Sequence, residues 1–521
     1  MQPHLPGGDA DRQQSTTIAV LIAGTRDASL PGMHGREHHR GLPPVMRRVA
    51  SLGFVLATLF VAAVATARVD PAERLALARH RGTPILTRGN PLAALPKPRG
   101  ERLVIGVMGS AAAEATIPAE VHGRLQRLGA AIARQGAVLL TGACGGMPQV
   151  TVRAARKAGG TTVGVTAAKT LQEHATTFRN PVDSLDVLQL TGAGAGMGLI
   201  AREKNNIRLS DIIVFAGGRS GTLGELLFAM HERKVVALLE DSTGVTAEAR
   251  GKILPHIGRG KATIVSDRDP EKLIAKAVKA AARLERGGTA TGAPRASSLS
   301  RLAVALRQQG KFARAPLDTA KLAQDHNIYS FFGTTRGMSA ADRANVDVLI
   351  DRIAKGRPGN RSPLLMLPTR RGLASQVARA ARARGVQTIG VSPAGSVEEH
   401  VRDKQFTAGL DRVQLTGEGL GVGQVATYQH AIKNADVVFV AGGDYQTLGG
   451  TIFAMYEPTV VAVLETGGMT GKLRKEILGT FNKTTAAKMV FDSDPDRLYR
   501  RAVATAAYLR RTTQQEYVGS E

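Results

Sequence analysis

The sequence contains no tryptophan, and aromatic residues make up only 4% of its 521 residues. It has one cysteine, Cys144, which excludes an internal disulfide and a metal site built from several cysteines. No cluster of His, Asp and Glu has ligand spacing either, so we expect no bound metal. Acidic residues are outnumbered, with 43 Asp and Glu against 69 Lys and Arg and a net charge of +26. This charge favours anionic partners, but no helix-turn-helix, zinc-finger or aromatic–basic pattern accompanies it, and we expect no specific nucleic-acid ligand.

Residues 46–67 have the three parts of a secretory signal. Met46 precedes two arginines, 19 uncharged residues follow, and the run ends in the small residues Ala65-Thr66-Ala67. We therefore predict export to the periplasm or the cell exterior, with cleavage after Ala67 and no stable membrane insertion afterwards. The alternative is a membrane anchor formed by residues 49–67, since a span needs about 20 residues. Residues 1–45 are predicted to be disordered or a mis-called extension, and the proline-containing residues 68–100 to be a basic tether.

The rest of the chain contains two copies of one sequence unit. Asp211 to Gly218 recurs as Asp436 to Gly443, and Thr222-Leu-Gly224 recurs as Thr447-Leu-Gly449, both at a spacing of 225 residues. A period this long indicates domain duplication. We predict one domain at 101–285 and a degenerate copy at 324–511, with a linker at 286–323 and a tail at 512–521.

Short apolar runs alternate with helical patterns inside each copy, which predicts an α/β fold with a parallel, doubly wound, Rossmann-like sheet. The expected strands of the first copy are Leu103–Met108, Ala137–Thr141, Thr161–Val165, Asp211–Ala216, Val235–Leu239 and Thr263–Val265. The expected helices are Pro118–Arg134, Gln149–Lys157, Leu199–Leu209 and Leu223–Glu232.

Three glycine-containing loops of the first copy follow predicted strands. In a doubly wound sheet these ends meet at one edge, where helix amino termini point N–H groups at anions. We therefore expect a phosphate-bearing ligand there, and neither a Walker motif nor a dinucleotide GxGxxG is present. The expected binding residues are Gly109, Ser110, Gly142, Gly145, Gly146, Gly217, Gly218, Arg219, Ser220, Gly221 and Thr222.

These motifs carry a resemblance. Gly145-Gly146 opening a helix, Arg202 on a later helix and the run Gly217–Glu225 resemble the Lonely-guy phosphoribohydrolases, formerly called lysine-decarboxylase-like proteins, and the related molybdenum-cofactor carriers. Lonely-guy enzymes have the strict motif PGGxGTxxE and an Arg-Lys pair. Here Gly217 replaces the proline, Arg219 replaces the second glycine, and Glu203 follows Arg202. The Glu173-His174 pair is closer to the carrier branch.

The resemblance implies cleavage of the N-glycosidic bond of a nucleoside 5′-monophosphate without a required cofactor. Glu225 and Arg202 would be the catalytic residues. A non-catalytic carrier of a nucleotide or a related phosphate-bearing cofactor is the alternative. Whether the chain is an enzyme at all stays open at this point.

Each candidate also has a plain structural interpretation. Thr222 and Glu225 have the spacing of a capping box, and Arg202 could be a solvated helix residue. The second copy has Thr427 and Gly450 at these positions, and the joint loss of Arg and Glu indicates a joint role. Cys144 is interpreted as a loop residue, and His174 and His400 as holding a loop shared by both copies.

Proteins of the resembled superfamily generally pair as homodimers and complete each site with partner residues. A tandem copy is a partner at high effective concentration, so we predict an intramolecular pseudo-dimer with one working pocket. Residues of the second copy should line its rim, and further homo-oligomers are allowed. The alternative is two independent domains joined by the linker.

Overall fold

The structure is a computed structural model, and it describes part of the chain. The described residues are 85–87, 90–95, 102–192, 198–232, 234–257, 260–286, 303, 309–313, 317–333, 339–417, 422–433, 435–466, 469–472 and 487–518. The predicted amino-terminal extension and signal peptide lie outside them, as do residues 519–521 of the tail. Export therefore stays a prediction.

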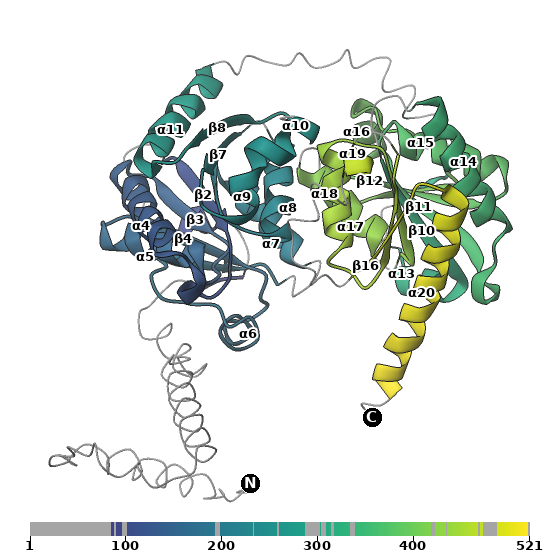
Figure 1. The fold of residues 1–521 in the computed structure, drawn as a ribbon, viewed down its shortest axis with the longest axis horizontal. Coiled ribbons are helices and arrows are strands. Elements are labelled where there is room, and N and C mark those ends of the chain that lie inside the picture. The colour runs from purple at the N-terminus through teal and green to yellow at the C-terminus, as the bar shows by residue number, and fades with distance from the viewer. Residues whose placement is uncertain are drawn as a thin grey trace, which may run out of the picture. The chain divides into compact units, whose positions relative to one another are not determined.

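The first copy forms one parallel eight-stranded sheet (Figure 1). Its strand order is β1-β5-β4-β3-β2-β6-β7-β8, which is doubly wound about β2. All residues of β3, β5, β6 and β7 are buried, because helices cover both faces of the sheet, whereas the edge strands β1 and β8 are half-buried. The strands are β1 (Ile85–Leu86), β2 (Val104–Gly109), β3 (Val138–Thr141), β4 (Thr161–Thr166), β5 (Val187–Leu190), β6 (Ile212–Ala216), β7 (Val235–Leu239) and β8 (Thr263–Asp267).

Alternate side chains of each strand enter two separate cores. Ile212 and Val214 pack with α4, α5 and α11 on one face, while Ile213 and Phe215 pack with α7, α8 and α9 on the other. This alternation follows from the two-residue period of a strand. The helices are α4 (Ala119–Arg134), α5 (Met147–Lys157), α6 (Leu171–Thr176), α7 (Gly198–Leu209), α8 (Ser220–Ala229), α9 (Gly244–Glu248), α10 (Leu254–Ile257) and α11 (Pro270–Arg286).

The second copy repeats this topology, with the order β9-β13-β12-β11-β10-β14-β15-β16. Its strands are β9 (Phe312–Ala313), β10 (His326–Gly333), β11 (Ser362–Pro368), β12 (Gln387–Ser392), β13 (Arg412–Leu415), β14 (Val437–Ala441), β15 (Val460–Leu464) and β16 (Lys488–Asp492). Its helices are α13 (Thr319–Asp325), α14 (Ala340–Lys355), α15 (Leu373–Ala383), α16 (Val397–Arg402), α17 (Val422–Ile432), α18 (Tyr445–Ala454), α19 (Met469–Lys472) and α20 (Pro495–Val518). The predicted fold class, two tandem Rossmann-like parallel sheets, is confirmed.

Two segments expected only as connections also add edge strands. β1, from the segment 68–100, pairs with β5, and β9, from the segment 286–323, pairs with β13. The two edge strands occupy matching positions in the two sheets. The duplicated unit therefore extends further toward the amino terminus than the repeated motifs alone indicate.

Matching helices of the two copies pack against each other, α8 on α18 and α7 on α17. Phe228 and Phe453, which are equivalent positions, stack with ring centroids 4.2 Å apart and an angle of 14° between the rings. One continuous apolar cluster contains buried residues of both copies. Pairing of equivalent surfaces is the geometry of a two-fold dimer. The predicted pseudo-dimer is therefore observed, and the alternative of two independent domains is wrong.

None of the helices in the described ranges has the length and apolarity that a membrane span requires.

Candidate functional site

A cavity of about 290 Å³ lies where β2, β3 and β6 end. The loops after β2 and β3 contribute Gly109, Ser110 and Gly142 to its wall. The other expected site residues that line it are Arg202, Arg219, Gly221, Thr222 and Glu225. The structure thus brings together residues that are more than 110 positions apart in the sequence.

The amino terminus of α8 opens into this cavity. Arg219 is the N-cap residue of α8 and its side chain makes no capping hydrogen bond. The first N–H groups of an α-helix have no partner within the helix. Among the described residues, none accepts a hydrogen bond from the backbone N–H of Ser220, Gly221 or Thr222. These donors and the positive end of the helix dipole make the site suitable for an anion.

The glycine loop before α8 shapes this end of the cavity without lining it. Gly217 and Gly218 have φ of +65° and +97°, which residues with a side chain rarely adopt. A Cβ on Gly218 would lie 2.2 Å from Thr222 Oγ1. The Ser242 hydroxyl accepts a hydrogen bond from Gly217 N at 2.8 Å, and Thr246 Oγ1 donates to Gly217 O at 2.6 Å. The loop is therefore fixed by the segment that follows β7.

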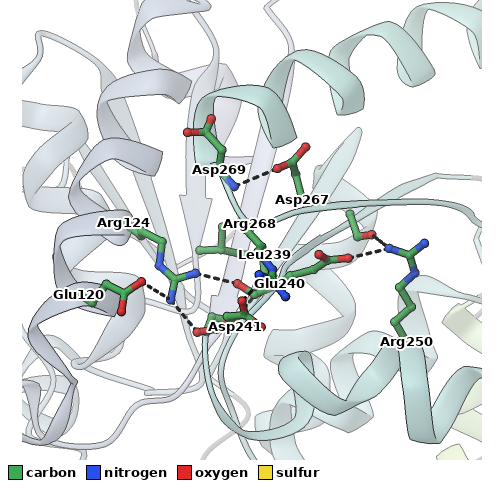
Figure 2. A network of polar contacts seen from close by, with 11 residues as sticks. Glu120, Arg124, Leu239, Glu240, Asp241, Arg250, Asp267, Arg268 and Asp269 are labelled. Carbon is green, nitrogen blue, oxygen red and sulfur yellow. Dashed lines mark hydrogen bonds and ion pairs between the residues drawn. The ribbon is translucent and has the colours of Figure 1, made fainter.

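A polar network holds that segment in turn (Figure 2). Arg124 on α4 donates hydrogen bonds to the carbonyl oxygens of Glu240 at 2.9 Å and Asp241 at 2.7 Å. Arg124 is 8% exposed, so these are buried charge-assisted hydrogen bonds. Arg250 pairs with Glu240 at 2.7 Å from the other side. Arg124 on α4 thus holds the segment after β7, and that segment holds the glycine loop before α8.

The amino terminus of α5 differs from that of α8, although both follow glycine loops. Met147 N already donates to Ser110 O at 2.9 Å, and Pro148 has no N–H to offer. Gly146 has φ of +72°, and a Cβ there would lie 2.3 Å from Ser110 O. Gly146 therefore lets two loops cross, whereas a Cβ on Gly145 would meet nothing, and neither glycine lines the cavity. Of the two helix termini, only that of α8 offers N–H groups without a partner among the described residues to this cavity.

Three charged side chains, Arg202, Glu203 and Glu225, lie together in the wall of the cavity. Arg202 Nη2 lies 3.5 Å from Glu203 Oε1 and 4.0 Å from Glu225 Oε1. Gly142 permits this placement, since a Cβ there would be 3.3 Å from Arg202 Cζ. Burial raises the pKa of Glu225 to about 7, against the opposing effect of Arg202. Burial, followed by the charge of Glu225, raises the pKa of Glu203 well above its usual value.

Two plain interpretations of these residues are not what the structure shows. Thr222 lies inside α8 and not at its N-cap, so Thr222 and Glu225 do not form a capping box. The Arg202 side chain is only 15% exposed, so it is not a solvated helix arginine. In the sequence, Glu203 stands out only because it replaces the lysine of the Arg-Lys motif. Burial, followed by the charges of Lys433 and of the next residue, Lys204, lowers the pKa of His430 on α17.

Tyr456 of the second copy lines the cavity, as expected for a residue completing the site from the paired domain. Its hydroxyl would lie 2.9 Å from a Cβ on Gly221, in the first turn of α8. Burial, followed by the charges of Glu203 and Glu225, raises the pKa of its hydroxyl, so the phenol is neutral. No motif singled out Tyr456 in the sequence.

Cys144, His174 and His400 have structural positions, as the sequence predicts. Cys144 is half-buried at the cavity wall, and burial raises the pKa of its thiol, which leaves little thiolate for nucleophilic attack. His174 Nδ1 lies 2.9 Å from Thr166 Oγ1, and His400 Nδ1 lies 2.9 Å from Ser392 Oγ. Both imidazoles are buried and tie a helix to the strand before it. Across the described ranges, no group of three or more His, Cys, Asp or Glu could hold a metal.

The corresponding place in the second copy has lost the features of an anion site. Asp444 stands where Arg219 does, and its carboxylate accepts hydrogen bonds from Gln446 N at 2.9 Å and Thr447 N at 3.4 Å. The helix amino terminus of α18 is therefore capped by its own chain. Tyr428 replaces Glu203, and its ring meets that of Phe332 at 4.9 Å in an edge-on contact. Of the two described copies, the first alone has both the uncapped helix terminus and the buried acids.

Comparisons with known proteins agree with the resemblance. Residues 102–274 match the model of the SLOG cluster4 family. The first copy thus carries that family's sequence pattern, and the superfamily resemblance named above is confirmed for it. No curated protein matches the sequence.

Among solved structures, the molybdenum cofactor carrier protein from Chlamydomonas reinhardtii is 28% identical, with a TM-score of 0.27 over 36% of this chain and 99% of that one. The molybdenum cofactor binding protein from Rippkaea orientalis is 28% identical, with a TM-score of 0.27 over 34% and 97%. DNA processing protein A from Streptococcus pneumoniae is 18% identical, with a TM-score of 0.27 over 34% and 61%. The absence of a nucleic-acid ligand stays a prediction.

Proposed function

We propose that the cavity of the first copy binds a nucleoside 5′-monophosphate and that the protein cleaves its N-glycosidic bond, releasing the base and ribose 5-phosphate. The observation that carries this proposal is the position of Glu225. Its carboxyl group lines the same small cavity into which the uncapped amino terminus of α8 opens. A phosphate held at one end would therefore place the ribose near a carboxyl group.

The phosphate would lie at the N–H groups of Ser220, Gly221 and Thr222, with the guanidinium of Arg219 beside it. Backbone donors at a helix terminus match the oxygens of a phosphate, and the arginine adds a charge-assisted contact. A cavity of about 290 Å³ is at the lower end of the usual range for small-molecule sites, about 300–1,000 Å³. This size favours a mononucleotide over a dinucleotide.

Glu225 would act on the ribosyl centre. Cleavage of an N-glycosidic bond develops positive charge on the ribose, as in glycoside hydrolysis, and a carboxylate can stabilise that charge or accept a proton from the attacking water. A pKa of about 7 leaves a large fraction of Glu225 ionised near neutral pH. Arg202, 4.0 Å away, orients the carboxylate.

A second candidate is a carrier that binds the nucleotide or a related phosphate-bearing cofactor without turnover. The departures Gly217, Arg219 and Glu203 from the strict motif of the enzymes favour it. Both candidates use the same anion site, and they differ only in whether the bond is cleaved.

Incubation of the purified chain with a panel of nucleoside 5′-monophosphates tests the proposal, with free base measured by chromatography. We expect release of base from at least one nucleotide and a loss of about 100-fold or more in kcat for Glu225→Gln. Glu271→Gln is the matched control, because Glu271 does not line the cavity and its weak pairing with the exposed Arg127 and Arg134 contributes little. Binding without base release would support the carrier instead.

A further inference from the structure

Glu203 is the most deeply buried acid of the cavity. Its side chain is 2% exposed, and it lines the cavity beside Arg202. Its Oε1 atom faces Arg202 Nη2 at 3.5 Å, whereas Oε2 has no hydrogen-bond partner among the described residues. A buried carboxyl oxygen without a partner is costly, so such groups mark places where a ligand completes the site.

Glu203 and Glu225 share one cation. Both carboxyl groups lie within 4.0 Å of the same nitrogen of Arg202, in a pocket with little access to water. A single guanidinium cannot neutralise two buried carboxylates, so one of the two retains its proton. The more buried Glu203, with its raised pKa, is the one that stays protonated, while Glu225 titrates near neutrality. Two acids in different protonation states can serve as acid and base in one reaction.

We propose that Glu203 is the general acid of the reaction, donating its proton to the nitrogen of the departing base. This inference rests on the proposed function. Water attacks C1′ of the ribose and passes a proton to Glu225, while the electron pair of the C–N bond goes to the base. The base nitrogen takes the proton of Glu203. The products are free base and ribose 5-phosphate, and a proton then returns from Glu225 to Glu203 through solvent.

The second copy supports a joint role of these three residues. At the positions of Arg202, Glu203 and Glu225 it has Thr427, Tyr428 and Gly450, so cation and both acids are lost together. Arg202 and the two acids are therefore present together or absent together, as a shared role requires.

The decisive experiment varies the leaving group. We compare the wild-type chain with Glu203→Gln on two substrates, a purine nucleoside 5′-monophosphate and one whose base is a pyridinium. A purine needs a proton to leave, whereas a pyridinium departs as a neutral molecule. We expect Glu203→Gln to lower kcat by about 100-fold or more on the purine nucleotide and by less than about threefold on the pyridinium nucleotide. Glu225→Gln should impair both.

Equal losses on both substrates would overturn the acid role of Glu203 and leave the proposed function intact. Failure of the wild-type chain to cleave either substrate would overturn both.

Glu203→Asp keeps a proton donor and should recover part of the purine activity, which a purely structural role would not predict. Infrared difference spectra provide a readout without turnover. A protonated carboxyl band at pH 7 that is missing in Glu203→Gln is expected, and its absence in the wild-type chain would contradict the proposal.

Discussion

Glu225 is a residue whose position costs stability. Its usual pKa is 4.5, and burial raises it to about 7 in the folded chain. Below pH 4.5 the carboxyl group is protonated in both states and has no effect. Between pH 4.5 and 7 the unfolded chain loses this proton before the folded chain does, so stability falls as the pH rises. Functional sites often retain such unfavourable groups.

Glu225→Gln should therefore be more stable than the wild-type chain at pH 8, by about 2–3 kcal/mol, and nearly equal to it at pH 4.5. Urea unfolding at the two pH values measures the difference. An effect of the same size at both values would show that Glu225 is not titrating in the folded protein.

Tyr456 contributes a neutral hydroxyl next to the anion site. A hydrogen bond to a charged group contributes about 1.5–3 kcal/mol. Tyr456→Phe should therefore raise the dissociation constant for a nucleoside monophosphate by about tenfold or more, without changing the fold. Tyr508→Phe is the matched control, because Tyr508 is 57% exposed and does not line the cavity. Unchanged affinity in Tyr456→Phe would remove Tyr456 from the binding site.

At the scale of elements, α8 and α18 are the same helix with opposite amino-terminal chemistry. Arg219 leaves the N–H groups of α8 free, whereas Asp444 caps those of α18. Arg219→Asp should cap α8 in the same way, abolish phosphate binding and stabilise the helix by about 1 kcal/mol. Asp444→Arg is the matched control and should retain binding while losing stability. Calorimetric binding and thermal unfolding of both variants test this, and undiminished binding in Arg219→Asp would contradict it.

The Arg124 network acts on the site from a distance. Arg124→Lys removes the two-pronged contact to the carbonyl groups of Glu240 and Asp241 but keeps the charge. The segment after β7 should loosen, and nucleotide affinity should fall by about threefold to tenfold, although Arg124 does not line the cavity. Arg127→Lys, on the exposed side of α4, should bind normally. Identical affinities in the two variants would show that the network is purely structural.

The sequence predicted most elements of the first sheet because continuous apolar runs mark buried parallel strands. No strand is predicted over β5, although its last two residues begin a motif, Gln189-Leu-Thr-Gly192, that recurs as Gln414-Leu-Thr-Gly417. β1 and β9 have two residues each, and they form only because a distant strand offers an edge. The apolar pattern predicts a helix from Leu223, whereas α8 begins at Ser220, because Ser220-Gly221-Thr222 contains no apolar pattern.

The candidate site could be predicted where it depends on local motifs. Glycine loops, Arg202 and Glu225 carry recognisable spacing, and strand order brings them to one edge. Tyr456 could not be found this way, because it enters the cavity through packing of α8 against α18, for which no sequence spacing exists. Glu203 stands out in the sequence only because it replaces the lysine of the Arg-Lys motif. Its closeness to Glu225 depends on the packing of α7 against α8, which sequence spacing does not give.

At the scale of the molecule, the two described domains form a pseudo-dimer within one chain, and only the first domain carries Arg202, Arg219 and Glu225. Phe228 and Phe453 hold the matching helices together, and the second copy contributes Tyr456 to the site of the first. Covalent linkage keeps this partner at a high effective concentration. If the proposed function holds, the second copy is required without an anion site of its own, because its Tyr456 completes the wall of the cavity in the first copy.

Calorimetric titration of the full chain with a nucleoside 5′-monophosphate tests this account most directly, because it counts working pockets. The account predicts a stoichiometry of one ligand per chain, since α8 has free N–H groups and α18 is capped by Asp444. A stoichiometry of two ligands per chain, or no binding of any nucleoside monophosphate, would contradict it.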